Sequence, residues 1–295
     1  MADPRGKSPR PKVIYVMGAG HSGSTILGVT LGNCANTFFA GEVEEWLVNS
    51  GRPAIGGSER TRFWQLVREQ VDCAAELFGP GPNRLLERSS AILRVDRWPR
   101  RRRIRPGYRR VAEQLFRAIA RAAQAQYVVD TSHFPLRARE LQQIEGIDLY
   151  LLFLVRSPER VLASELRHIR RHHRAERRAQ AIRVNARLWM VHLLSVLVFL
   201  KQPRERRLFL RHEDFLASPQ TALREILDLV GSDAEIPDLT ALKTGVPLLG
   251  NKLIRSDVVA LEAPAVASAS NSRATTMLQA PWRLIFSRLE PAVRV

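Results

Sequence analysis

The sequence predicts an α/β fold of three layers, in which helices cover both faces of a central parallel β-sheet. Short apolar runs alternate with longer stretches of helical periodicity along the 295 residues, and such alternation is typical of a parallel sheet. A glycine-rich turn joins the first apolar run to the first helical stretch, which indicates a strand, loop and helix unit. The hydrophobic content of 45% is sufficient for one sizeable core.

Each element follows from its local pattern. The predicted strands are the apolar runs Val13–Met17, Thr37–Ala40, Tyr127–Asp130, Leu149–Val155 and Leu208–Arg211. The predicted helices are Ser24–Leu31, Glu59–Phe78, Tyr108–Gln126, Pro135–Ile144, an interrupted stretch from Pro158 to Leu200, and Pro219–Val230, which Gly231 closes. Pro80–Gly107 has little pattern and includes the run Arg100–Arg103, so we expect a surface loop or flap there.

We expect residues 1–12 to be a mobile tail and 13–295 to form a single domain. The tail is charged and lacks the apolar core of a signal peptide, and no run reaches the roughly 18 apolar residues of a membrane span. The longest apolar run, Leu188–Leu200, contains His192 and Ser195 and predicts a buried helix. The chain has two cysteines and no CxxC pattern, so we expect neither a disulfide scaffold nor a metal site, and a cytoplasmic location.

The formal net charge is +17, and arginine supplies most of it. Such a charge attracts polyanions, which include nucleic acids, anionic membranes and phosphorylated small molecules. The arginine bias also fits a GC-rich genome. The run of arginines between residues 167 and 187 is either a solvated helix face or a guide for anions.

The stretch Gly18–Thr25, GAGHSGST, follows the first predicted strand. Its glycines let the backbone approach an anion, and the amides at the following helix N-terminus favour negative charge. The stretch resembles the phosphate loop G-x-x-x-x-G-K-[ST], but Ser24 stands in place of the lysine that reaches the terminal phosphates of ATP. The pattern therefore favours a phosphate other than the end of ATP, or else a tightly packed turn.

With Ser24 in that place, the stretch resembles the first loop of the sulfotransferases that use 3'-phosphoadenosine-5'-phosphosulfate (PAPS). His21 takes the place of that family's lysine or arginine in [K/R]-S-G-[ST]-[ST]. The resemblance implies a P-loop-like fold and a loop that binds the 5'-phosphosulfate. The loop residues implied are Gly20, His21, Ser22, Gly23, Ser24 and Thr25.

A second match lies in LLFLVRSPERVLASELR. In the family, an arginine at a strand end and a serine eight residues later hold the 3'-phosphate; Arg156 and Ser164 have this spacing. A planar guanidinium suits a phosphate, although Arg156 also has glutamates nearby with which to pair. The segment GNKLIR resembles the family's C-terminal lid and makes Arg255 a third ligand. The resemblance is thin over about residues 51–125, where we expect acceptor specificity to lie.

Two residues are candidates for the base that accepts the proton of the acceptor. Glu42 in FFAGE resembles the G-E element of several carbohydrate, tyrosyl-protein and bacterial sulfotransferases, and its apolar neighbours Phe39 and Trp46 would raise its pKa. His133 in VVDTSHFP resembles the histidine segment of cytosolic sulfotransferases, whereas bacterial relatives have a lysine there. We favour Glu42 as the base and His133 as a hydrogen-bond donor, with His21 beside the transferred group.

The sequence thus predicts a PAPS-dependent sulfotransferase that acts without a metal on a hydroxyl of a small molecule, glycan or lipid. The acceptor and the oligomeric state stay open. A P-loop nucleoside or sugar kinase is the nearest alternative. A basic nucleic-acid-binding protein is a further one, although no recognition motif is present and few aromatic residues accompany the arginines.

Overall fold

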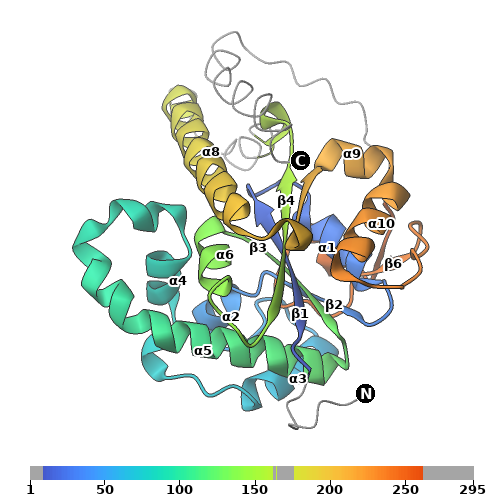
Figure 1. Cartoon of the computed structure of the whole chain (residues 1–295), viewed down its shortest axis with the longest axis horizontal. Helices are drawn as coiled ribbons and strands as arrows, with labels where there is room; N and C mark the ends of the chain where they lie inside the picture. Colours follow the sequence, from blue (N-terminus) through green and yellow to red (C-terminus); the bar gives the residue numbers. More distant parts are fainter. Residues whose placement is uncertain (1–8, 162–163, 165–175, 262–295) are drawn as a thin grey trace.

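The core of the structure is a five-stranded parallel sheet with the strand order β2-β3-β1-β4-β5 (Figure 1). The computed structural model describes residues 9–161, 164 and 176–261. The strands of this sheet are β1 (Lys12–Gly18), β2 (Thr37–Gly41), β3 (Tyr127–His133), β4 (Asp148–Val155) and β5 (Arg207–Arg211). Each predicted strand is present, and Lys12, which we expected in the tail, begins β1. The predicted α/β class with a central parallel sheet is confirmed.

The described helices pack on the two faces of this sheet. They are α1 (Ser24–Gly32), α2 (Glu45–Val48), α3 (Ser58–Glu69), α4 (Pro80–Leu86), α5 (Trp98–Ala123), α6 (Pro135–Leu141), α8 (Glu176–Lys201), α9 (His212–Ala217) and α10 (Pro219–Val230). Short 3₁₀ turns are η1 (Ala75–Leu77), η2 (Ser89–Leu93), η3 (Val95–Arg97), η4 (Arg204–Arg206) and η5 (Lys252–Arg255). A small antiparallel pair, β6 (Leu242–Lys243) and β7 (Val258–Val259), lies beside them.

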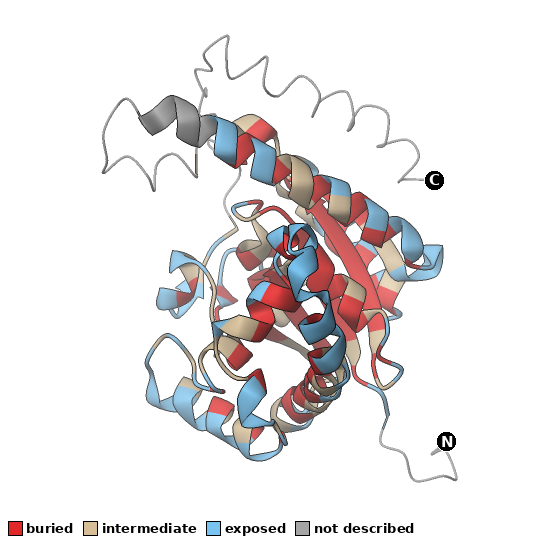
Figure 2. Ribbon diagram, turned by 90° about the vertical axis from the view of Figure 1, so that its left-hand side faces the viewer, coloured by how far each residue is buried: buried red, intermediate tan, exposed pale blue. Residues whose placement is uncertain are grey.

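Alternating side chains of β1 enter two separate cores, as expected for a central strand. Val13, Tyr15 and Met17 pack into the larger cluster with residues of α2, α3, α4, α5, α6 and α8. Ile14 and Val16 pack into the second cluster with residues of α1, α9 and α10. Figure 1 shows these two helical layers on opposite sides of the sheet, and Figure 2 shows the buried strands between them.

The prediction of a loop over Pro80–Gly107 is wrong. This stretch contains α4, η2, η3 and the start of α5, which runs on through Pro106. A proline inside a helix costs roughly 3 kcal/mol, but Ile104 and Tyr108 on either side of it are buried in the core. Burial of such side chains contributes about 1.5–3 kcal/mol each, so tertiary packing offsets the local cost.

The helix predicted over Glu59–Phe78 is also shorter than expected. α3 ends at Glu69, and a single 3₁₀ turn, η1, follows. After α3 the amide of Asp72 donates to Oε1 of Gln114 on α5 at 3.0 Å. This contact lies far away in the sequence, so local periodicity did not indicate it.

Helix α8 contains the run Leu188–Leu200, which we predicted to be a buried helix. Val184, Leu188 and Phe199 are buried, while Leu193 and Leu197 on another face are exposed. Within the described part of the chain, Ile182–Lys201 is long and apolar enough to cross a membrane by length and composition, with 44% of that window buried. Because one face packs on the sheet, α8 serves here as a core helix with an apolar outer face.

Two irregularities lie at the carboxyl end of the sheet. Between β1 and β3 the register shifts, so that Tyr15 pairs with Asp130 and Met17 with His133. Between β2 and β3 it shifts again, and Gly41 pairs with Asp130. Bulges of this kind change the direction of the side chains that follow. They lie next to Glu42 and His133, the two candidates for the base.

Candidate active site

The phosphate loop joins β1 to α1 and has the geometry of an anion site. Gly23 precedes α1 with φ 93°, and no side chain of the described residues caps the helix, whose first turn contains no acidic residue. The amides of a helix N-terminus without such partners attract an anion. A Cβ on Gly23 would lie 2.3 Å from the ring of His212, so a glycine is required at this position.

The described residues include a cavity of about 450 Å³ beside this loop. This volume lies in the usual range for small-molecule sites. The predicted site residues that line it are Gly20, His21, Gly23, Ser24, Thr25, Glu42 and His133. The fold therefore brings the loop and both candidates for the base to one cavity, although they come from three separate segments.

Ser22 does not line the cavity. Its side chain is buried and donates a hydrogen bond to the carbonyl of Ala19 at 2.7 Å. The hydroxyl of Ser22 therefore braces the loop from within, which leaves its backbone amide as the group that would contact an anion.

Glu42 directly follows β2 and is half-buried in the cavity wall. Burial raises its pKa to about 7, and the nearby carboxylates of Glu45 and Asp130 add to this effect. The direction is the one expected from the apolar neighbours in the sequence. A carboxylate with a pKa near the working pH is well suited to accept a proton.

Glu44, which the sequence analysis did not single out, lies in the same wall. Its side chain is 2% exposed, and its Oε2 has no hydrogen-bond partner among the described residues. Burial raises the pKa of Glu44 well above its usual value, and the charge of Glu42 raises it further. The spacing Glu42-x-Glu44 was a visible signal, because alternate residues after a strand can turn toward the same cavity.

His133 ends β3 in a left-handed backbone conformation, with φ 57°. For a non-glycine residue this conformation is uncommon, and it occurs preferentially at functional sites. Burial lowers the pKa of His133 to about 4. At neutral pH the imidazole is therefore uncharged, which suits a hydrogen-bond donor better than a base.

A buried ionic network lies beneath His133 and fixes the end of β3. Arg137 of α6 donates to Asp130 at 3.1 Å and to Glu87 at 2.7 Å, and all three side chains are at most 2% exposed. Asp130 also accepts from the amide of Ser132 at 2.9 Å. The Oγ of Ser132 in turn accepts from the amide of Glu44 at 3.2 Å. The network thus links the strand that carries His133 to the segment that carries Glu42.

Arg156 follows β4 and contacts the phosphate loop from the other side. Its Nη1 donates to the carbonyl of His21 at 3.0 Å. The next residue, Ser157, donates its amide to Glu213 at 3.0 Å, which fixes the turn after the strand. Ser164 is helical and half-buried. The structure thus places Arg156 against the loop, and the role of Ser164 stays a prediction.

Arg255 lies apart from this cavity. It is exposed in η5 and lines a separate hollow together with Arg60 and Asp257. From the same predicted lid, Asn251 lines the cavity beside the phosphate loop instead. Because Arg255 does not line the cavity beside the phosphate loop, its role as a third ligand stays a prediction.

The remaining wall of the cavity comes from segments that the sequence patterns did not mark. Arg88, Ser89 and Ser90 contribute from α4 to η2, and α8 contributes a basic and apolar set. The residues from α8 are Arg187, Leu188, Met190 and Val191. The first group falls within residues 51–125, where we expect acceptor specificity. The arginines expected between 167 and 175 lie outside the described residues.

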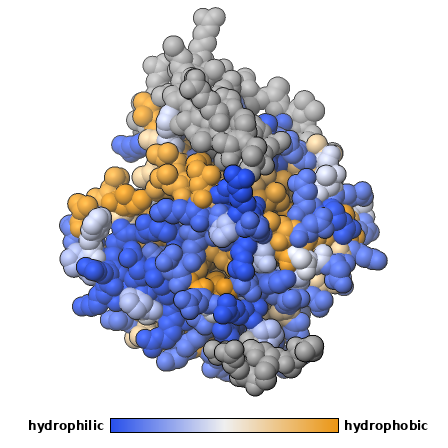
Figure 3. All heavy atoms as spheres, viewed as in Figure 1, coloured by the Kyte–Doolittle hydropathy of each residue, from blue (hydrophilic) through white to orange (hydrophobic). Residues whose placement is uncertain are grey.

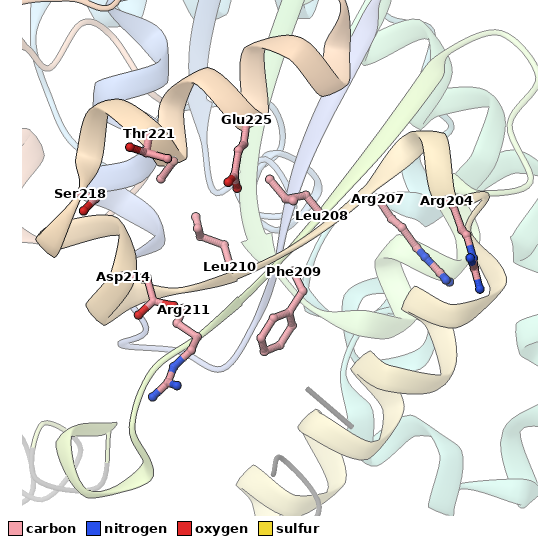
Figure 4. Close-up of a pocket in the computed structure, with 11 residues that line it drawn as sticks. Arg204, Arg207, Leu208, Phe209, Leu210, Arg211, Asp214, Ser218, Thr221 and Glu225 are labelled. Carbon is pink, nitrogen blue, oxygen red and sulfur yellow. The ribbon is translucent and has the colours of Figure 1, made fainter. Parts of the chain in front are cut away.

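A second groove follows the edge strand β5 and α10 (Figure 4). It contains Arg211, Asp214 and Glu225, but none of the predicted site residues. We therefore place the candidate active site at the phosphate loop.

Comparison with solved structures confirms the predicted fold. A sulfotransferase domain from the olefin synthase of Synechococcus PCC 7002 has a TM-score of 0.53 at 16% identity, covering 95% of this chain and 96% of that one. A sulfotransferase from Mycobacterium avium has a TM-score of 0.49 at 14% identity, and the match covers 95% of this chain and 78% of that one. A sulfotransferase from Alicyclobacillus acidocaldarius has a TM-score of 0.48 at 15% identity, and the match covers 97% of this chain and 96% of that one. No protein-family model and no curated protein sequence matches the chain. The first of these matches, together with the five-stranded parallel sheet, shows that the chain has the three-layer, P-loop-like fold that sulfotransferases have.

Proposed function

We propose that this protein transfers a sulfuryl group from PAPS to a hydroxyl of an acceptor. The observation that carries the proposal is one cavity that joins an uncapped helix N-terminus, Glu42 and His133 on a sulfotransferase fold. PAPS supplies an activated sulfuryl group next to a phosphate. The loop amides and the guanidinium of Arg156 are the donors that phosphates require.

In this proposal the residues that line the cavity act together with Arg156 and Ser164, which do not line it. The loop binds the donor's 5'-phosphate, and Arg156 binds its 3'-phosphate with the help of Ser164. Glu42 holds the acceptor hydroxyl and accepts its proton as the oxygen forms a bond to sulfur and the bond from sulfur to the phosphate oxygen breaks. Uncharged His133, together with His21, donates hydrogen bonds to the oxygens that gain charge.

A ligand experiment tests the proposal against the kinase alternative. We expect 3'-phosphoadenosine-5'-phosphate (PAP), the product of PAPS, to raise the melting temperature more than ATP does, with no need for magnesium. Mass spectrometry of an acceptor panel incubated with PAPS should then find a gain of one SO3. Stabilisation by ATP with magnesium, and none by PAP, would reject the proposal.

Replacing Arg156 by methionine should weaken PAP binding by about 10- to 150-fold, since a charge-assisted hydrogen bond contributes roughly 1.5–3 kcal/mol. Arg204→Met is the matched control, because this exposed arginine precedes β5 at the opposite end of the parallel sheet. Both variants remove one positive charge. Titration calorimetry with PAP measures the difference, and an equal affinity in the two variants would contradict the role of Arg156.

The pH dependence follows from the pKa values of Glu42 and His133. A base is active when deprotonated, so kcat/KM should rise tenfold per pH unit below about 7 and level off above it. His133, with a pKa of about 4, stays uncharged across this range and therefore causes no second change of slope in the pH profile of kcat/KM. A profile that rises instead near pH 4 would assign the base to His133.

A further inference from the structure

Large apolar side chains are exposed on the turns that follow the cavity wall. Ser89 and Ser90 line the cavity, and the chain then presents four exposed apolar residues in η2, η3 and the first turn of α5. These residues, which we name the apolar ledge, are Ile92, Leu93, Val95 and Trp98. Leu93 is 71% exposed and Trp98 61%, so neither contributes much to the core.

Helix α8, which packs against η2, carries a second exposed apolar row. Leu193, Leu197 and Leu200 are between 45% and 52% exposed, and their spacing of four and three residues places them on one helix face. Figure 3 shows hydrophobic atoms gathered over α8 and over the neighbouring turns on the same side of the molecule. A continuous apolar surface of this kind indicates an interaction site.

Arginines accompany the ledge. Six arginines and one acidic residue, Asp96, lie between positions 94 and 103, and all six except Arg101 are exposed. Arg101 is buried and donates to the carbonyl of Ala91 at 3.2 Å, which fastens the ledge to α5. A fixed row of apolar side chains beside cationic ones is complementary to an anionic lipid surface.

We propose that the apolar ledge docks the protein on an anionic lipid surface, and that the acceptor hydroxyl belongs to an amphipathic lipid taken from it. A tryptophan prefers the boundary between apolar chains and polar headgroups, and the arginines attract the anionic headgroups. The cavity wall next to the ledge has the same character, since Arg88 and Arg187 stand beside Met190 and Val191. The acceptor part of this inference rests on the proposed sulfuryl transfer, whereas the docking part does not.

Co-sedimentation of the full-length protein with vesicles, in the absence of PAPS, tests the docking. We expect binding to phosphatidylglycerol vesicles that weakens as salt is raised, and little binding to phosphatidylcholine vesicles. The double variant Leu93→Ser, Trp98→Ser should lower the affinity about tenfold or more. Replacing Arg100 and Arg103 by serine should lower it by roughly 10- to 30-fold. Leu66→Ser is the matched control, because Leu66 is 49% exposed on α3, outside the ledge.

Absence of binding to anionic vesicles, or equal binding by the ledge and control variants, would overturn the proposal. A dimer that depends on the ledge, without vesicle binding, would overturn it in favour of a protein contact. The substituted side chains are exposed, so an unchanged melting temperature should confirm that each variant is folded. With PAPS present, transfer to water-soluble acceptors but not to hydroxylated lipids would overturn the acceptor part of the proposal. If the unaltered protein does not bind PAP, the sulfotransferase function is rejected, but the docking part of the proposal is unaffected.

Discussion

Replacement of Glu42 by glutamine is expected to lower kcat by about two or more orders of magnitude, the usual contribution of a general base. The amide has nearly the same size and cannot accept the proton of the acceptor. The affinity for PAP should stay nearly constant, because the proposed function gives the contacts to phosphate to the loop amides and Arg156 rather than to Glu42. The single-turnover rate at which the sulfated acceptor forms measures the loss in catalysis, and calorimetry with PAP measures the affinity separately.

The matched control for this variant is Glu45→Gln, since Glu45 lines the same cavity. It should retain most of the activity. The pH profile of the residual activity in Glu42→Gln should lose its rise near pH 7, the value of the raised pKa of Glu42. Near-normal turnover in Glu42→Gln together with a large loss of turnover in His133→Gln would contradict Glu42 as the base and assign that role to His133.

Replacement of Arg137 by methionine is expected to destabilise the fold by about 3–5 kcal/mol, the typical cost of breaking a buried ion pair. Asp130 and Glu87 would remain buried with no opposite charge between them. The Nη1 of Arg137 also donates to the hydroxyl of Tyr108 at 2.8 Å, and this contact would be lost too. Urea denaturation measures the change in the free energy of unfolding.

Arg117→Met is the control, because Arg117 pairs with Glu113 one helical turn away and both side chains are about one-third exposed. Such surface pairs contribute about 0.3–0.5 kcal/mol. A similar loss of stability in the two variants would show that the buried network does not hold the end of β3. We also expect the folded fraction of Arg137→Met molecules to turn over more slowly, since Asp130 and Ser132 connect His133 to the Glu44 segment.

Local sequence patterns determined the sheet and the phosphate loop. The strands are short apolar runs separated by longer helical stretches, and the loop has glycines where the backbone needs them, as at Gly23. The contact of Arg156 with this loop was also predictable, because an arginine at the carboxyl end of a parallel strand lies at the same edge as the loop. These features depend only on the order of residues along a short stretch, so a single sequence is sufficient to predict them. The role of Arg156 as a phosphate ligand stays a prediction.

The tertiary structure decided the rest of the site. The burial of Glu44 and Arg137, and the pKa values of Glu42 and His133, depend on groups that are far apart in the chain and meet only at the end of β3. The helix through Pro106 and the exposed position of Trp98 depend on which side chains the core accepts. Sequence periodicity reports what one segment can form alone, whereas burial and electrostatic coupling are set by the segments packed around it.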